Sequence, residues 1–310
     1  MAPPKRPRKG SLQVWPRKRA SKFLPSVNWD AIDSGKSLKG FITYKAGMTS
    51  VHAKDKTPDS MTKDKKIVFP VTILECPPMK ILSIRFYKHG KVMDELVSDN
   101  LDKYLKRVIK LPKTKIKKIE DIKEYDDVRL IVYSEVKKTN IKKTPDLTEI
   151  GLTGSVEEKI NFAKSHLNKE LTMGEFFDRG QLVDLRGLSK GKGFQGPVKR
   201  FGVTLRSHKA EKGVRKVGSV GPWHPARTTF RTPMAGQLGM FTRLQYNSHI
   251  VHFGKADLKN LKNFGDIKTD YVLVQGSVQG PVKRQVLITS PLRKTKKQDK
   301  RNYEFIEVLR

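Results

Sequence analysis

The sequence predicts a mainly β fold, a small barrel or sandwich, with a mixed α/β insertion and a long non-globular basic segment. Three observations support this. Short β-branched and aromatic runs recur along the chain, helix-period patterns are confined to its middle, and residues Arg186 to Arg243 follow neither period. The 310 residues suffice for one or two hydrophobic cores. Hydrophobic residues make up only 36%, so we expect part of the chain to lie outside a core.

The charge balance predicts an anionic partner. Lys and Arg number 64 against 31 Asp and Glu, a formal net charge of +33. Nucleic acid is favoured over a membrane surface, because no basic amphipathic helix and no run of roughly 18 apolar residues occurs. Cys76 is the only cysteine, which excludes an intramolecular disulfide and a cysteine-based zinc site. The first 22 residues lack the apolar core of a signal peptide, so we expect an intracellular location.

The predicted strands fall in two groups: the first four lie before or between the predicted helices, and the other five follow them. Proline and glycine residues separate the strands, as Pro77-Pro78 separates the second from the third. The first group reads as the walls of the barrel or sandwich. The strands are expected at Lys39–Tyr44, Ile67–Leu74, Lys80–Tyr87, Val128–Tyr133, Gln181–Arg186, Ser248–Phe253, Tyr271–Gln275, Gln285–Thr289 and Tyr303–Leu309.

Three helices are predicted between residues 98 and 180. The first, Ser98–Leu111, carries Leu101, Leu105 and Val108 on one face and ends before Pro112. The second follows the capping-box pattern Ser155-Val-Glu-Glu158. The third follows Thr172-Met-Gly-Glu175 and ends near Gly180. The first two are expected to pack on the sheet as ordinary amphipathic helices.

The N-terminal residues form a basic arm in which five prolines exclude a continuous helix. Trp15, Phe23 and Trp29 are spaced among its cations. Such an arm is either solvated or lies in an RNA groove, and the aromatics favour the groove. The candidate RNA contacts are Lys5, Arg6, Arg8, Lys9, Arg17, Lys18 and Arg19.

The basic segment, Arg186–Arg243, holds thirteen Lys or Arg residues, one acid, ten glycines and four prolines. We expect no self-sufficient interior, because so few apolar residues cannot offset the ordering entropy. Interspersed aromatics indicate a partner with exposed bases, namely structured RNA. Predicted strands on both sides anchor the segment, so the fold can fix its direction, unlike that of a free tail. The candidate phosphate contacts are Lys190, Lys192, Lys199, Arg200, Arg206, Lys209, Lys212, Arg215, Lys216, Arg227, Arg231 and Arg243.

Within this segment we define the tip loop as Gly218–Arg227. Pro222 and Pro225 bracket Trp223 and His224, and fix the backbone φ on either side of them. Trp223 either anchors a small satellite core or, with His224, contacts RNA bases. The scarcity of hydrophobic neighbours favours the RNA contact.

Enzyme motifs are weak or absent. Gly191–Gly196 matches G-x-G-x-x-G, but no amphipathic helix follows, and position 216, about 20 residues on, is a lysine where the dinucleotide fold needs an acid. Ser219 lacks the glycine two residues before it that a nucleophile elbow requires. His249 and His252 are expected on opposite faces of a strand, which disfavours a shared metal. We therefore expect no catalysis, cofactor or metal. The alternatives are an RNA-modifying or tRNA-processing enzyme with basic appendages, and a DNA binder.

Four motifs together resemble the universal large-subunit ribosomal protein L-three family in its archaeal and eukaryotic form. They occur in family order across nearly the whole chain, and only residues 240–247 depart from the expected pattern. The motifs are Gly40-Phe-Ile-Thr-Tyr-Lys-Ala-Gly-Met-Thr49, Ser189-Lys-Gly-Lys-Gly-Phe-Gln-Gly196, Gly221-Pro-Trp-His-Pro-Ala-Arg227 and Met234-Ala-Gly-Gln-Leu-Gly239.

The resemblance implies a translation-protein-type β-barrel with an α/β insertion, bound to large-subunit rRNA and neighbouring ribosomal proteins in the cytoplasm. It implies a role in subunit assembly and an internal finger whose tip approaches the peptidyl transferase centre. The expected parts are an arm (1–35), a first barrel part (36–95), the insertion (96–174), barrel continuation and finger root (175–200), the finger (201–245), and a last barrel part with a basic C-terminal segment (246–310).

Overall fold

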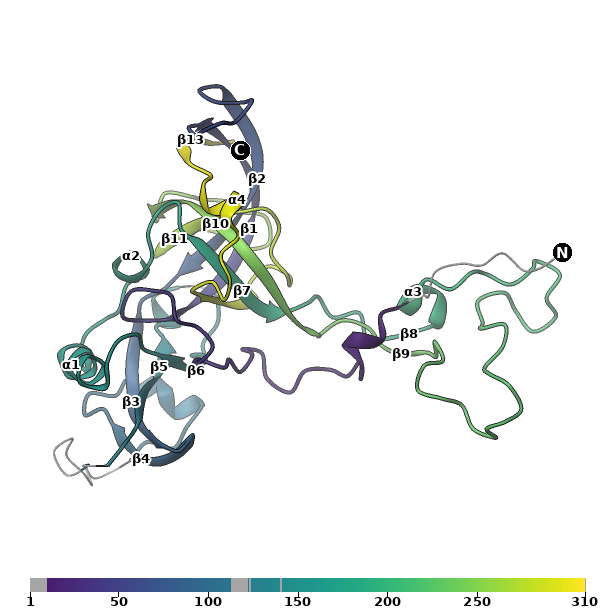
Figure 1. Ribbon diagram of the computed structural model, residues 1–310, viewed down its shortest axis with the longest axis horizontal. Coiled ribbons are helices and arrows are strands. Elements are labelled where there is room, and N and C mark those ends of the chain that lie inside the picture. The colour runs from purple at the N-terminus through teal and green to yellow at the C-terminus, as the bar shows by residue number, and fades with distance from the viewer. Residues whose placement is uncertain (1–9, 113–121, 123, 140, 310) are drawn as a thin grey trace. The chain divides into compact units, whose positions relative to one another are not determined.

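The computed structural model describes residues 10–112, 122, 124–139 and 141–309, and it confirms a mainly β fold (Figure 1). The chain forms two compact units. The larger one comprises Leu24–Gly187 and Arg243–Arg310, and the smaller one comprises Met1–Phe23 and Leu188–Thr242. The smaller unit therefore combines the start of the arm with most of the basic segment.

The larger unit contains a seven-stranded sheet with the order β12-β7-β10-β11-β2-β1-β13. Because β12 also pairs with β1, six of these strands form a closed ring of pairings and β13 lies outside it. This topology favours the barrel over the sandwich. The strands are β1 (Gly40–Asp55), β2 (Lys66–Cys76), β7 (Leu182–Leu188), β10 (Thr242–Lys255), β11 (Asp270–Gln275), β12 (Gln285–Thr289) and β13 (Tyr303–Leu309).

A second sheet has the order β4-β3-β5-β6. The strands predicted at 80–87 and 128–133 exist, but the prediction that they form walls of the barrel was wrong, because both belong to this sheet. Pro77-Pro78 separates β2 from β3 at the point where the chain changes sheet. The strands are β3 (Met79–Lys88), β4 (Lys91–Val97), β5 (Asp127–Ser134) and β6 (Leu147–Gly151).

Two of the predicted helices are confirmed. Helix α1 (Val156–His166) begins at a complete capping box, in which the Ser155 side chain accepts from the Glu158 amide and Glu158 accepts from the Ser155 amide. Helix α2 (Met173–Phe176) is one turn long, and the Thr172 hydroxyl bonds the Glu175 carboxylate instead of capping the backbone.

The predicted helix over residues 98–111 was wrong, because only the 3₁₀ turn η2 (Lys103–Arg107) forms there. Asp102 precedes it with extended backbone and makes no cap. Its carboxylate instead accepts from the Tyr133 hydroxyl at 2.7 Å and from Lys80 Nζ at 3.4 Å. Contacts with β5 and β3 therefore use the group that a helix N-terminus would need. The remaining short turns are η1 (Leu12–Val14), η4 (Val136–Lys138) and α4 (Lys296–Asp299).

The end of the predicted arm belongs to the core. Trp29 and Ile32 are 2% and 0% exposed, so the expectation that Trp29 contacts RNA from a basic arm was wrong. Its indole lies so close to Gly40 and Gly151 that a Cβ on either glycine would come within 3 Å of it. Burial of the large Trp29 indole stabilises the fold. The proline-rich composition of the arm did not indicate that this residue would be buried.

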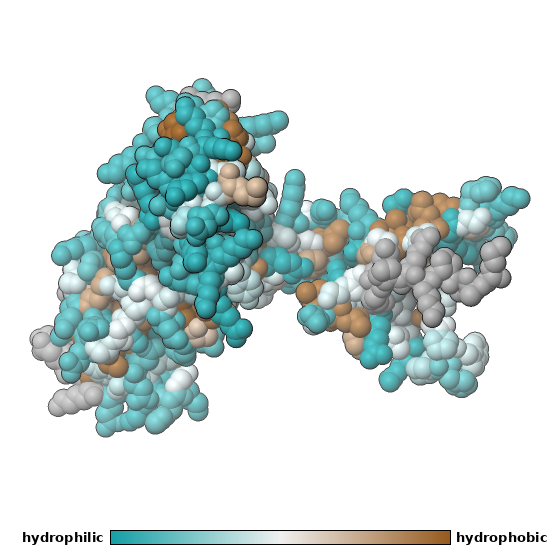
Figure 2. Space-filling model, turned by 45° about the horizontal axis from the view of Figure 1, so that its top comes forward, coloured by the Kyte–Doolittle hydropathy of each residue, from teal (hydrophilic) through white to brown (hydrophobic). Residues whose placement is uncertain are grey.

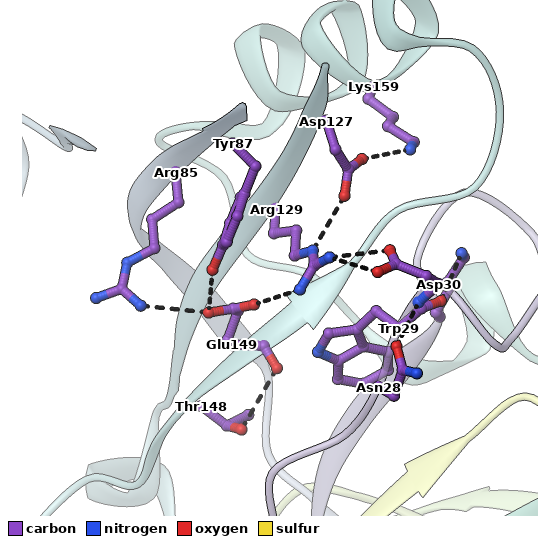
Figure 3. A network of polar contacts seen from close by, with 11 residues as sticks. Asn28, Trp29, Asp30, Arg85, Tyr87, Asp127, Arg129, Thr148, Glu149 and Lys159 are labelled. Atoms are coloured by element: carbon purple, nitrogen blue, oxygen red, sulfur yellow. Dashed lines mark hydrogen bonds and ion pairs between the residues drawn. The ribbon is translucent and has the colours of Figure 1, made fainter. Parts of the chain in front are cut away.

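An ion-pair network holds the end of the predicted arm, at Asp30, on the second sheet (Figure 3). The Arg129 guanidinium, 14% exposed, contacts Asp30, Asp127 and Glu149. Glu149 also accepts from Arg85 and from the Tyr87 hydroxyl, and Lys159 of α1 pairs with Asp127 at 2.6 Å. Each charge is thus matched, which offsets the cost of removing the charges from water. Within the described part of the chain, no helix is long and apolar enough to cross a membrane.

Candidate RNA-binding surface

Backbone hydrogen bonds join the two ends of the basic segment. The Ser189 amide donates to the Phe241 carbonyl, the Lys192 amide to Leu238 and the Leu238 amide to Gly193. The short strands β8 (Phe194–Gln195) and β9 (Gly236–Gln237) continue this pairing. Gly239 has φ +78°, and a Cβ there would lie 2.0 Å from the Lys190 carbonyl oxygen, so only glycine fits.

A small aromatic cluster forms the interior of the smaller unit. Trp15 stacks on Phe201 with ring centroids 5.8 Å apart and meets Phe230 edge-on at 5.8 Å. Phe201, at the end of α3 (Pro197–Phe201), is 6% exposed, and Phe241 is 8% exposed. We call the part where the two ends of the segment pair its base. The expectation of a segment without its own interior was therefore wrong at the base, because the arm supplies the ring of Trp15.

Arg200 is a structural residue at this base as well as a cation. Its Nε donates to the Gln237 carbonyl at 3.0 Å and its Nη1 to Met234 at 2.9 Å. Its guanidinium also lies over the Phe201 ring, as that of Arg17 does, at 5.0 and 4.7 Å. Burial, with a further contribution from Arg17, lowers the pKa of Arg200. Much of its donor capacity is used within the protein, unlike that of a typical phosphate ligand.

Beyond the base, residues 203–235 contain neither helix nor strand and are mostly exposed. Trp223 is 85% exposed, so it does not anchor a satellite core. The tip loop shapes an open groove of about 280 Å³ around this indole, lined by Val220, Trp223, Pro225 and Arg227 among others. An exposed indole beside a cation can stack on a base and contact its phosphate together.

Most of the predicted phosphate contacts are exposed and unpaired. Within the described residues, none of the following forms an ion pair: Lys190, Lys192, Lys199, Arg206, Lys209, Lys212, Arg215, Lys216 and Arg227. His224, Arg231 and Arg243 are also exposed, and Arg231 lies over the Phe230 ring at 5.5 Å. Glu211 is the only acid of the segment, so it cannot neutralise these cations.

The arm residues differ among themselves. Lys18 and Arg19 are exposed, whereas Arg17 is half-buried against Phe201 and donates to the Ser11 carbonyl. Lys5, Arg6, Arg8 and Lys9 lie outside the described residues. On the visible face in Figure 2, small hydrophobic patches of the unit that contains the basic segment lie among hydrophilic residues. This mixture suits a surface that contacts both bases and phosphates.

The expectation that His249 and His252 lie on opposite faces of their strand was wrong. A bulge between Ile250 and His252 inserts one residue into β10 and reverses the alternation. Both imidazoles therefore face β13, where His249 meets Tyr303 edge-on and His252 stacks on Phe305. Among the described residues, no three His, Cys, Asp or Glu side chains could share a metal ion.

Sequence reasoning missed a polar pocket in the larger unit. It is lined by Leu182, Gln245, Tyr246, Asn247, Ser248, His249, Gln275, Gln298 and Arg301. The polar run before the buried part of β10 was a signal for it, as was the basic cluster from Arg293 to Arg301. Neither indicated that the two would meet, because His249 and Arg301 are 52 positions apart and register between distant strands is not local information.

The chain has a mainly β core and a cation-rich segment whose two ends are paired. These features define a class of protein that binds a polyanion. The chain belongs to the family described as Ribosomal protein L3, whose model matches residues 1–308. This confirms the resemblance of the motifs. It also makes the chain a ribosomal protein and not an enzyme, against the alternative of an RNA-modifying activity.

Curated relatives of similar length carry the name Large ribosomal subunit protein uL3. One from Methanocaldococcus jannaschii is 40% identical over 93% of this chain and 92% of its own length. One from Archaeoglobus fulgidus is 40% identical over 94% of this chain and 93% of its own length. One from Pyrobaculum aerophilum is 39% identical over 94% and 93%. All three are archaeal, which agrees with the archaeal and eukaryotic form of the family that the motifs resemble.

Proposed function

We propose that this protein is a structural component of the large ribosomal subunit that binds large-subunit rRNA through the basic segment and the arm. The observation that carries the proposal is the set of nine exposed, unpaired cations in a segment with one acid. Such charges gain free energy when they neutralise phosphates and release counterions. The names of the archaeal relatives support the subunit assignment.

The finger carries the second part of the proposal. The larger unit is a rigid base, the aromatic cluster fixes the root of the finger, and the tip loop presents Trp223 and His224 to rRNA near the peptidyl transferase centre. The exposure of the Trp223 indole supports this role. Neighbouring ribosomal proteins and a part in subunit assembly belong to the same proposal, as do a cytoplasmic location and the translation-protein-type barrel. The division into six parts also belongs to it, except that β3 lies in the second sheet and Trp29 and Ile32 lie in the core.

Co-sedimentation with ribosomal particles tests the assignment. We expect the chain to sediment with large subunits at low salt and to be released as the salt concentration rises, because each phosphate contact makes binding more sensitive to salt. A chain that stays in the supernatant at low salt, or that sediments with chromatin in preference to ribosomes, would contradict it.

A further inference from the structure

The polar pocket of the larger unit has the features of a binding site. Its volume is about 200 Å³, below the range of about 300–1,000 Å³ typical of cofactor pockets, so it suits a small planar group. Tyr246 at its edge is 54% exposed and offers an aromatic face. Four amide side chains also line the pocket: Gln245, Asn247, Gln275 and Gln298.

Hydrogen bonds to a buried carboxylate fix the part of β10 that lines the pocket. Asn247 has φ +51°, which asparagine tolerates better than most residues. The fully buried Asp184 carboxylate accepts from the Asn247 amide at 2.8 Å and from the Leu292 amide at 3.0 Å. These bonds connect the start of β10 to the chain that leads into α4, so both walls of the pocket are fixed.

Three lining residues contain buried polar atoms that have no hydrogen-bond partner among the described residues: Asn247 Oδ1, Ser248 Oγ and His249 Nδ1. Ser248 and His249 are 5% and 3% exposed. Buried polar groups without partners are rare and costly, so a set of three around one pocket points to a ligand.

The hydrogen-bonding roles of these atoms define the chemistry of the ligand. His249 Nε2 lies 3.1 Å from the Arg301 carbonyl and must donate to it, so Nδ1 of the neutral ring is an acceptor. Burial lowers the pKa of His249, which keeps the ring neutral. Asn247 Nδ2 donates to Thr295 Oγ1, which leaves Oδ1 as a second acceptor. A phosphodiester of the RNA backbone offers only acceptors and does not fit these atoms.

We propose that this pocket takes one unstacked RNA base that carries an exocyclic amino group. The amino group donates toward the unpartnered acceptors of Asn247, Ser248 and His249, and the ring stacks on Tyr246. The exposed cations Lys296, Lys297 and Lys300 and the pocket residue Arg301 lie on or beside α4, where they hold the adjoining phosphates. This site rests on the proposed function, because it requires that the chain bind RNA.

Binding of the full-length chain to labelled single-stranded oligoribonucleotides of about eight nucleotides tests the site. Uracil has no exocyclic amino group, so oligo(A) and oligo(C) are expected to bind at least about fivefold more tightly than oligo(U), the lower end of a base-contact effect. Tyr246→Ala weakens binding to oligo(A) and oligo(C), and Ser248→Ala reduces the preference. Tyr246→Phe keeps the stacking and restores wild-type affinity.

The outcomes separate the two proposals. If none of the oligonucleotides binds in a salt-sensitive way, the proposed RNA-binding function itself is contradicted. Salt-sensitive binding with equal affinity for the three sequences, or with a preference that Tyr246→Ala leaves intact, overturns the pocket alone. Ultraviolet crosslinking in intact large subunits gives a second measurement: a crosslink from Tyr246 to an amino-bearing nucleotide supports the site, and one to a protein overturns it.

Discussion

Trp223 contributes little to the folding of the isolated chain, which makes its proposed role at the tip testable. At 85% exposure its indole buries little surface, so replacing it removes little folding free energy. We expect Trp223→Ala to leave the thermal unfolding midpoint of the isolated protein unchanged while it disturbs tRNA accommodation or large-subunit maturation. Sucrose-gradient profiles and aminoacyl-tRNA binding measure the effect. Wild-type assembly and translation in this variant would count against the tip role.

Trp15 provides the matched comparison, because its ring packs between Phe201 and Phe230. Trp15→Ala is expected to loosen the base of the basic segment, which limited proteolysis detects. A Trp15→Ala protein as protease-resistant as the wild type would show that the aromatic cluster does not hold the segment.

Arg200 tests whether a cation of the segment is structural. Arg200→Lys keeps the charge but loses the planar group that reaches the Gln237 and Met234 carbonyls. We expect local opening to become easier by about 1–3 kcal/mol, the cost of leaving such acceptors unpaired. Hydrogen exchange of the Lys192 and Leu238 amides measures it, and Lys199→Ala, an exposed neighbour, is the control. Unchanged protection in Arg200→Lys would assign this residue to RNA contact alone.

The distal part of the finger behaves as a separate element. Residues 203–235 form no helix or strand, and the backbone bonds that close the base involve residues on either side of them. We therefore expect deletion of residues 204–232 to abolish stable incorporation into mature subunits while the larger unit remains folded. Circular dichroism checks the fold and gradient sedimentation checks incorporation. Normal incorporation of the shortened chain would refute the role of the finger.

The contact between β10 and β13 predicts a pH dependence. Burial lowers the pKa of both His249 and His252, so the unfolded state binds more protons once the pH falls below about 6.5. Their contribution to stability is present above that pH and is lost as the pH falls through the folded-state pKa values, by at most about 1.4 kcal/mol per pH unit for each histidine.

His252→Phe isolates this effect, because phenylalanine preserves the ring stack on Phe305, where the centroids are 4.1 Å apart. Urea denaturation at pH 7.5 and 5.5 should show a smaller stability difference in this variant than in the wild type. His208→Gln, which changes an exposed histidine, should match the wild type. Equal pH dependence in wild type and His252→Phe would contradict the assignment.

Local patterns predicted the elements well and their partners less well. The strands Gln285–Thr289 and Tyr303–Leu309 and the capping box at Ser155 follow from neighbouring residues, and the structure has them as predicted. Membership of β3 in a second sheet, the bulge before His252 and the burial of Trp29 depend on pairing with distant residues, which periodicity does not encode. The cations were predictable by residue type, but the structural use of Arg200 was not.

At the scale of the whole molecule, the two units obtain their stability from different sources. The larger unit contains nearly all of the buried hydrophobic residues. Residues 188–242 of the smaller unit contain eleven Lys or Arg residues and one acid. Their mutual repulsion opposes compaction, so a polyanion stabilises this unit more than it stabilises the larger one.

This imbalance predicts a steep salt dependence of rRNA binding. If about ten phosphates are neutralised, affinity falls by about 10³–10⁵ between 50 and 200 mM salt. Replacing Lys209 and Lys212 by alanine should make the slope of log affinity against log salt less negative by nearly 2, since each lost contact releases about one fewer counterion. Replacement of both by arginine keeps the charge and should keep the slope. Filter binding to large-subunit rRNA over a salt series measures both. A slope that the alanine pair leaves unchanged would mean that these exposed lysines face solvent in the complex, and the phosphate contacts would then have to come from the arm and the remaining cations of the segment.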